Sequence, residues 1–143
     1  MSEAPGRSEA IVRQFYDRAW NAEDLTAYDD LVTDDFIDHR ALPGLPTGRE
    51  GFRQLEVLFR TAFPDVRVEV EGVVEEDDLV AARWISTGTH RGPLFGIPAT
   101  CRPVRVTAMV VYRVQDGRLS EGWINRDHLG VLPHPREVPA PGS

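Results

Sequence analysis

The spacing of apolar residues changes once along this chain of 143 residues, at Val66. Before Val66, apolar residues recur at intervals of three and four, as on one face of an α-helix. From Val66 they alternate with charged residues, as in a strand with one buried face. Helices followed by antiparallel strands indicate the α+β class. We expect a cone-shaped barrel of curved antiparallel or mixed sheet, closed by the N-terminal helices, whose hollow mouth suits a small molecule.

Two helical patterns open the chain. The first covers 8–20, with Ser8 as a candidate N-cap, and its apolar residues share one helical face. The second is short and follows Asp24, a second candidate cap. A short strand over 35–39 comes next. A loop rich in Pro and Gly then separates it from the third helix.

The third helix is predicted to begin at Thr47. Thr47 and Glu50 have the spacing of a capping box, in which each side chain binds a free backbone N–H at the helix start. Pro64 ends the helix. Its expected buried stripe consists of Phe52, Leu55, Phe59, Ala62 and Phe63.

Strands fill the second half of the chain. The expected strands begin at Val66 and then cover 79–90, 104–114 and 118–128, and a Gly- and Pro-rich loop over 91–103 precedes the third of them. Asp116-Gly117 between the last two is a strong signal for a two-residue hairpin turn. The chain therefore predicts a single domain over 8–132, flanked by disordered ends at 1–7 and 133–143.

The hairpin turn predicts which residues of the last strand face inward. If Asp116 and Gly117 occupy the turn, the alternation of side chains places Trp123, Asn125 and Asp127 on one face of the sheet. That face is apolar with polar groups embedded in it. We expect it to line the cone.

The opposite face carries Met109, Val111 and Ile124 among arginines. Three clustered apolar residues on a nominally outer face predict a subunit contact, in a homodimer or homotetramer. The alternative is a few scattered exposed apolar side chains, which need no explanation.

Asp127 is the candidate general base. A carboxylate at the rim of an apolar pocket loses hydration, which makes it a better acceptor of a proton from carbon. The alternative is an ion pair with an arginine, but Arg126 is expected on the other face. His39 and His90, each at the end of a strand beside a loop, are the other candidate catalytic residues.

Composition excludes several other functions. All 16 basic residues are arginine and the formal charge is -7, so a protein that binds the phosphates of nucleic acid is not expected. The sequence contains no run of about 18 apolar residues, so no membrane-spanning helix is expected. Residues 1–7 lack the apolar core of a secretion signal, and Cys101 is the single cysteine, so a cytoplasmic location is expected.

No cofactor is predicted. His39, His90 and Asp127 are the residue types of a two-His-one-carboxylate iron site, but their dispersion along the chain gives no ligand spacing. No phosphate-binding Gly motif opens a helix. Cys101 lies in a loop with no activating base near it in sequence.

Several short segments together resemble one family. They are FIDH at 36–39, PG at 43–44, GREGF at 48–52, AFPD at 62–65, GTHRG at 88–92 and GIPAT at 96–100. The end pattern adds Tyr112-Arg113, Asp116-Gly117-Arg118, Glu121, Trp123 and Asp127. In this order, over residues 8–132, they resemble the SnoaL-like polyketide cyclases of the nuclear transport factor 2-like superfold.

The resemblance implies a function in antibiotic biosynthesis. Characterised members close the last ring of an aromatic polyketide by an intramolecular aldol condensation, without metal or organic cofactor. Their acid/base is an Asp on the final strand, which matches Asp127, and family histidines at the positions of His39 and His90 line the cavity. Asn125 departs from the acidic or bulky residues common there, and is expected to donate a hydrogen bond to the substrate. The other expected substrate contacts are Phe15, Tyr16, Trp84 and Trp123.

Other functions remain open on the same fold. One is a hydroxylase component that acts on an aromatic polyketide ring. Another is an epoxide hydrolase or isomerase, although no Arg-x-Asp occurs over 104–114. A third is a small-molecule-binding module without catalysis.

Overall fold

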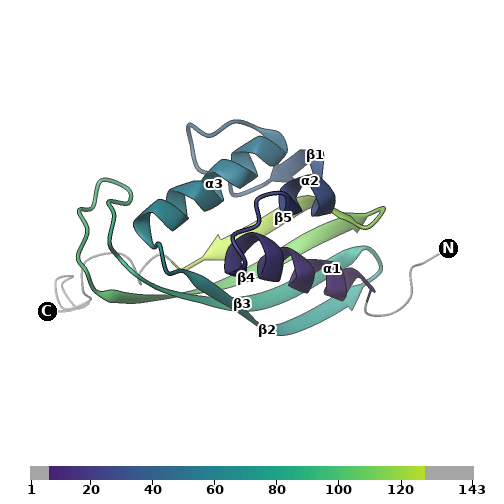
Figure 1. Ribbon diagram of the computed structural model, residues 1–143. Coiled ribbons are helices and arrows are strands. Elements are labelled where there is room, and N and C mark those ends of the chain that lie inside the picture. The colour runs from purple at the N-terminus through teal and green to yellow at the C-terminus, as the bar shows by residue number, and fades with distance from the viewer. Residues whose placement is uncertain (1–6, 128–143) are drawn as a thin grey trace, which may run out of the picture.

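The computed structural model describes residues 7–127. The order of elements is helices first and strands afterwards, with one early strand between them (Figure 1). In chain order the elements are α1 (Arg7–Phe15), the π-helix η1 (Tyr16–Asn21), α2 (Ala27–Leu31), β1 (Val32–Asp38), α3 (Gly48–Ala62), β2 (Arg67–Glu76), β3 (Leu79–Thr89), β4 (Pro103–Gln115) and β5 (Arg118–Arg126). The predicted α+β class is confirmed.

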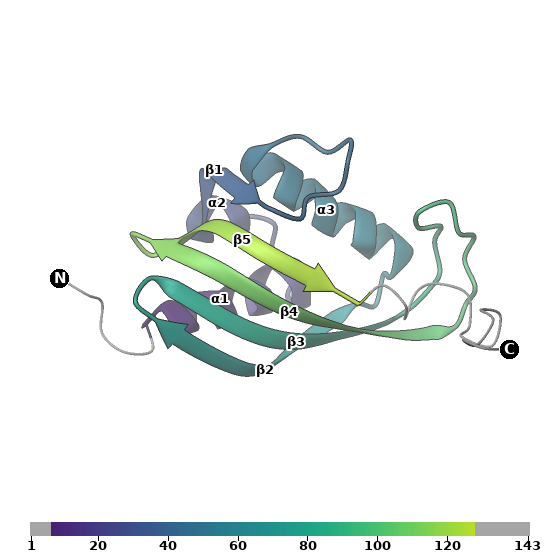
Figure 2. The same ribbon diagram turned by 180° about the vertical axis from the view of Figure 1, so that it is seen from behind.

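The strands form one curved, mixed sheet in the order β1-β5-β4-β3-β2. β1 runs parallel to β5, and the other neighbouring pairs are antiparallel. The helices lie on one face of the sheet, and Figure 2 shows the opposite face, which carries no helix within residues 7–127. This is the expected cone: an open sheet that curves around its helices. None of the helices of this part of the chain has the length and hydropathy needed to cross a bilayer.

The helix ends differ from those predicted. Ser8 lies buried within α1 and is not its cap, and α1 continues directly into η1. Thr26, not Asp24, precedes α2, and the Asp24 carboxylate accepts the Thr26 N–H. Thr47 does precede α3, but its side chain makes no capping hydrogen bond, so the predicted capping box is not formed. The predicted stripe of α3 is buried, as expected.

The centre of the molecule is aromatic. Phe15 and Phe36 both stack on Phe52, with ring centroids 5.5 and 4.5 Å away. Beside them the Tyr16 and Tyr112 hydroxyls lie 2.6 Å apart, and the Trp84 indole N–H donates to Tyr16 at 2.9 Å. Burial raises the pKa of Tyr16 to about 12, so its hydroxyl stays protonated. These side chains hold the helices against the sheet.

A β-bulge at Ser120 shifts the register of β5 against β4 by one residue. Val114 pairs with Leu119 as the turn predicts, but Arg113 then pairs with Glu121, so every later side chain of β5 lies on the opposite face from the one predicted. Uninterrupted alternation would turn Glu121 inward. The bulge instead places Gly122 inside, against the Tyr112 and Phe36 rings, and leaves Glu121 on the outer face, hydrogen-bonded to Arg113.

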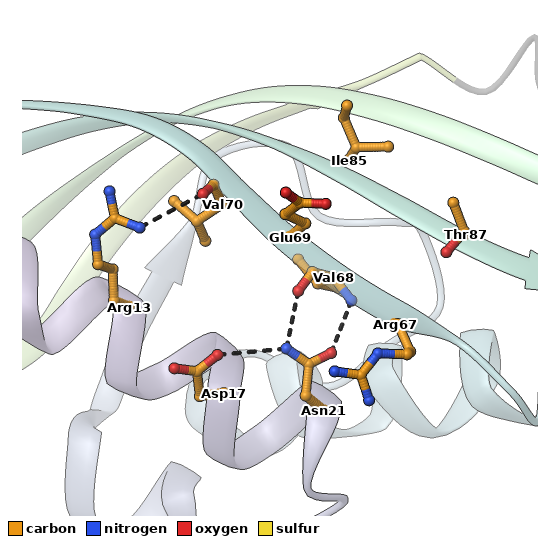
Figure 3. Close-up of a pocket in the computed structure, with 9 residues that line it drawn as sticks. All are labelled: Arg13, Asp17, Asn21, Arg67, Val68, Glu69, Val70, Ile85 and Thr87. Atoms are coloured by element: carbon orange, nitrogen blue, oxygen red, sulfur yellow. Dashed lines mark hydrogen bonds between the residues drawn. The ribbon is translucent and has the colours of Figure 1, made fainter.

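The outer edge of β2 is covered by side chains from the first helices. The Asn21 amide accepts the Val68 N–H and donates to the Val68 C=O, both at 2.8 Å, as a neighbouring strand would do (Figure 3). Arg13 donates to the Val70 C=O at 3.4 Å. The helices are therefore tied to the sheet by hydrogen bonds as well as by apolar packing.

Candidate active site

An apolar pocket lies between α3 and the concave face of the sheet. Aromatic and aliphatic side chains from helices and strands form its walls, and Ser86 and Arg126 are its polar groups. The lining residues are Trp20, Phe59, Phe63, Val66, Val68, Trp84, Ser86, Val106 and Arg126. The space between them is about 30 Å³, so a polycyclic ligand requires these side chains to move apart.

Arg126 enters this pocket from the end of β5. The bulge at Ser120 turns its side chain to the inner face, opposite Ala108 of β4. The guanidinium carbon lies 5.5 Å from the centre of the Phe59 ring, a cation–π contact. Its charge is one of the influences that oppose the rise in the pKa of Tyr16 caused by burial. The sequence prediction placed Arg126 on the outer face and was wrong for that reason.

His90 lies on the inner side, next to the pocket wall. Only 1% of the residue is exposed, and its ring lies 5.4 Å from Phe63, a lining residue, between ring centres. Its Nδ1 is 3.2 Å from the Thr100 hydroxyl, while its buried Nε2 has no hydrogen-bond partner within residues 7–127. Of the candidate catalytic residues, His90 is the one that the fold buries beside the pocket.

Asp127 follows β5 at the outer rim. Its backbone N–H donates to the Thr107 C=O at 2.8 Å, which extends the pairing with β4 by one residue. Its side chain is exposed and does not line the pocket. Within residues 7–127, this carboxylate therefore does not have the apolar surroundings expected for it, because the bulge turns Arg126 inward in its place.

His39, Trp123 and Glu121 meet on the other face of the sheet. The His39 Nε2 lies 2.7 Å from a Glu121 carboxylate oxygen, and the His39 ring stacks on Trp123 with 4.5 Å between centres. The hydrogen bonds from His39 and Arg113 lower the pKa of Glu121. The prediction that His39 and Trp123 line the cavity is wrong. Asn125 was also predicted on the wrong face, because it is exposed and lies opposite Met109.

The remaining predicted residues divide between pocket and core. Trp84 lines the pocket, but Phe15 and Tyr16 are buried in the aromatic centre and do not. Among the residues that the structure describes, no His, Cys, Asp and Glu side chains gather as a metal site, so His39, His90 and Asp127 do not meet.

A larger hollow of about 440 Å³ lies at the edge of β2 and is lined mainly by polar side chains, among them Arg13, Asn21 and Arg67 (Figure 3). Arg13 and Asn21 are hydrogen-bonded to β2 there. The apolar pocket is the better candidate because it lies within the cone and has aromatic walls.

Known proteins share this fold and sequence pattern. A curated relative, nogalonic acid methyl ester cyclase of Streptomyces nogalater, is 28% identical over 116 residues, which cover 80% of this chain and 87% of the relative. The crystal structure of IdmH from Streptomyces antibioticus, assigned as a polyketide cyclase, has 32% identity and a TM-score of 0.76, and the match covers 86% of this chain and 94% of IdmH.

AclR of Streptomyces galilaeus, assigned as a hydroxylase, has a TM-score of 0.80 over 95% of this chain and 100% of AclR. At 24% identity this likeness shows the fold alone. Residues 10–134 match the family described as SnoaL-like polyketide cyclase. This stretch includes nearly the whole of the described fold and carries the pocket. The chain therefore belongs to the SnoaL-like polyketide cyclase family.

Proposed function

We propose that this protein is a cofactor-independent cyclase that closes a ring of an aromatic polyketide by intramolecular aldol condensation. The observation that carries the proposal is the aromatic-walled pocket, with one cation inside it, in a member of this family. Trp20, Phe59 and Trp84 offer flat apolar surfaces to a polycyclic substrate. The relative from Streptomyces nogalater is named as a cyclase of nogalonic acid methyl ester, which supports ring closure as the reaction.

The proposed reaction needs one proton acceptor and one hydrogen-bond donor. A base removes a proton from a carbon flanked by two electron-withdrawing groups, and the electron pair of that C–H bond forms an enolate. The enolate carbon then bonds to a ketone carbon of the same molecule, and the new alkoxide takes the proton back from the base. Holding the two carbons in contact supplies the entropic part of the catalysis.

Asp127 is proposed as this acid/base on the family resemblance, and it follows the pocket residue Arg126 directly. The exposure of its carboxylate counts against it, because water weakens a carboxylate as a base. His90 is proposed as the donor to the enolate oxygen through its unpartnered Nε2, and as the alternative base.

The Asp127→Asn and His90→Asn variants test these assignments. The assay follows ring closure of an anthraquinone-type substrate, supplied as its methyl ester and as its free acid. Loss of the base is expected to reduce turnover by roughly 100- to 10,000-fold. Asp35→Asn, an exposed change on β1 away from the pocket, is the matched control. Undiminished turnover by Asp127→Asn would remove Asp127 from the mechanism, and a large loss in His90→Asn alone would make His90 the base.

We further propose that two or more copies associate through the outer face of the sheet. Met109 is 60% exposed there, opposite Arg83 on β3 and Asn125 on β5. Val111 and Trp123 pair in the next row of the same face. Ile124, predicted to join them, is instead buried inside. The apolar centre of this face, now Met109, Val111 and Trp123, supports a second copy as its partner.

A further inference from the structure

We propose that the pocket selects an anionic substrate, an aromatic compound whose ionised carboxylate pairs with Arg126. The inference rests on the proposed function for the location of the pocket and names the chemical class that the pocket takes. The inference comes from a difference between Arg126 and the other half-buried arginines in their ion pairs with carboxylates.

Half-buried arginines in this protein are otherwise paired with carboxylates. Arg18 binds Asp24 and Asp30, Arg60 binds Glu56 and Glu23, and the same holds for the rest. The half-buried arginines with a carboxylate within 4.0 Å are Arg13, Arg18, Arg49, Arg53, Arg60 and Arg113. Arg126 is half-buried as well, and within residues 7–127 no carboxylate forms an ion pair with it. Among residues 7–127, Arg126 is therefore the one half-buried arginine left to pair with an external anion.

The surroundings of Arg126 strengthen an ion pair between its guanidinium and a carboxylate of the ligand. Seven apolar side chains line the pocket, and Ser86 is the other polar residue in the wall. Removing a guanidinium from water without an anion is unfavourable, and its contact with the Phe59 ring offsets only part of that cost. A carboxylate can accept two parallel N–H bonds from a guanidinium, an arrangement that is stronger in apolar surroundings than in water.

The geometry also favours an acid group on a flat ring. Phe59 lies under the guanidinium, and Trp84 lines the same pocket from β3 of the sheet. A planar aromatic acid that enters from the rim can displace the guanidinium from Phe59, stack on that ring and bind Arg126 with its carboxylate. A neutral ester of the same ring makes the stacking contacts but offers no charge to the guanidinium.

Calorimetric titration with anthraquinone-2-carboxylate and with its methyl ester tests this inference. We expect the wild-type protein to bind the acid about tenfold or more tightly than the ester. Arg126→Met should abolish the preference, and Arg126→Lys should keep part of it. Arg105→Met is the matched control, because Arg105 is exposed on the outer face of β4, opposite Thr87. Thermal unfolding of each variant checks that the fold is intact.

A wild-type protein that does not favour the acid, or does not bind it, would overturn the inference. So would a preference that survives in Arg126→Met. The titration involves no turnover, which keeps the two proposals separate. If the acid binds through Arg126 but no ring closes, the cyclase proposal fails and the anion site stands. If a ring closes while acid and ester bind equally, only the anion site fails.

Discussion

Glu56 is a buried carboxylate that does not line the pocket. None of its surface is exposed, and it accepts the Tyr28 hydroxyl at 2.7 Å and an Arg60 N–H at 3.1 Å. Arg60 also donates to the Trp20 C=O, which ties α3 to the end of η1. Since Trp20 is a wall of the pocket, this buried group helps to fix one side of the site.

Replacing Glu56 with Gln should change how stability depends on pH. Burial raises the pKa of Glu56 above its ordinary value of 4.5, although the bonds from Tyr28 and Arg60 oppose the rise. From about pH 4.5 up to the raised pKa, the folded protein then holds a proton that the unfolded chain has lost. The stability of the wild type should fall with pH across that window, relative to Glu56→Gln.

Urea unfolding of both proteins between pH 4 and pH 8 measures this difference. Glu50→Gln, an exposed change on the same helix, is the control and should follow the wild type. Parallel curves for the wild type and Glu56→Gln would contradict the assignment.

At the level of single residues, the sequence predicted side-chain types better than side-chain directions. Phe15 and Trp84 are both aromatic residues in apolar patterns, yet the first is buried in the core and the second lines the pocket. Burial in a core and exposure to a dry pocket produce the same sequence pattern, so only packing separates them. Arg126 was missed because its direction depends on the bulge before it.

Among the elements, β5 determines what the site contains. Its turn pairs as predicted, and one extra residue at Ser120 then exchanges the two faces of the strand. Gly122 is the signal in the sequence that could have indicated this. A glycine within a strand often marks a bulge or a close approach, and here the space of its missing side chain is taken by rings. An inward Gly122 also requires an inward Ile124 and Arg126.

Gly122→Ala should therefore destabilise the protein. An added Cβ would lie 3.0 Å from the Tyr112 ring and 3.1 Å from the Phe36 ring, and both rings are buried. Such overpacking is expected to cost about 1–3 kcal/mol of unfolding free energy, measured by chemical denaturation. Gly72→Ala is the matched control, since its Cβ would meet nothing within 4 Å. Equal stability of the two variants would mean that Gly122 does not face inward.

For the molecule as a whole, the period of the apolar residues was enough to predict the class, the order of elements and the cone. These features depend on which segments have an apolar face, and each segment shows its face independently. The side chains that each face of the sheet carries depend instead on long-range register, such as the pairing of β1 with β5 and of His39 with Glu121. Such pairings join residues far apart in the chain and leave no local pattern.

Association through the outer face gives a prediction at this scale. Met109→Asp places a charge on the exposed side chain beside Val111 and Trp123, and it should dissociate the oligomer to monomers, as measured by sedimentation velocity. Val57→Asp, on the exposed side of α3, should not change the sedimentation coefficient. A wild-type protein that sediments as a monomer, or a Met109→Asp variant that stays oligomeric, would contradict this interface.

The amide of Asn21 on the border of the sheet has one more consequence. An edge strand with unpaired N–H and C=O groups is a template to which another polypeptide can add as a further strand, and so begin a fibril. At Val68 the donor and the acceptor that an incoming chain needs are both occupied by Asn21. The addition of a further strand past β2 is therefore blocked at Val68.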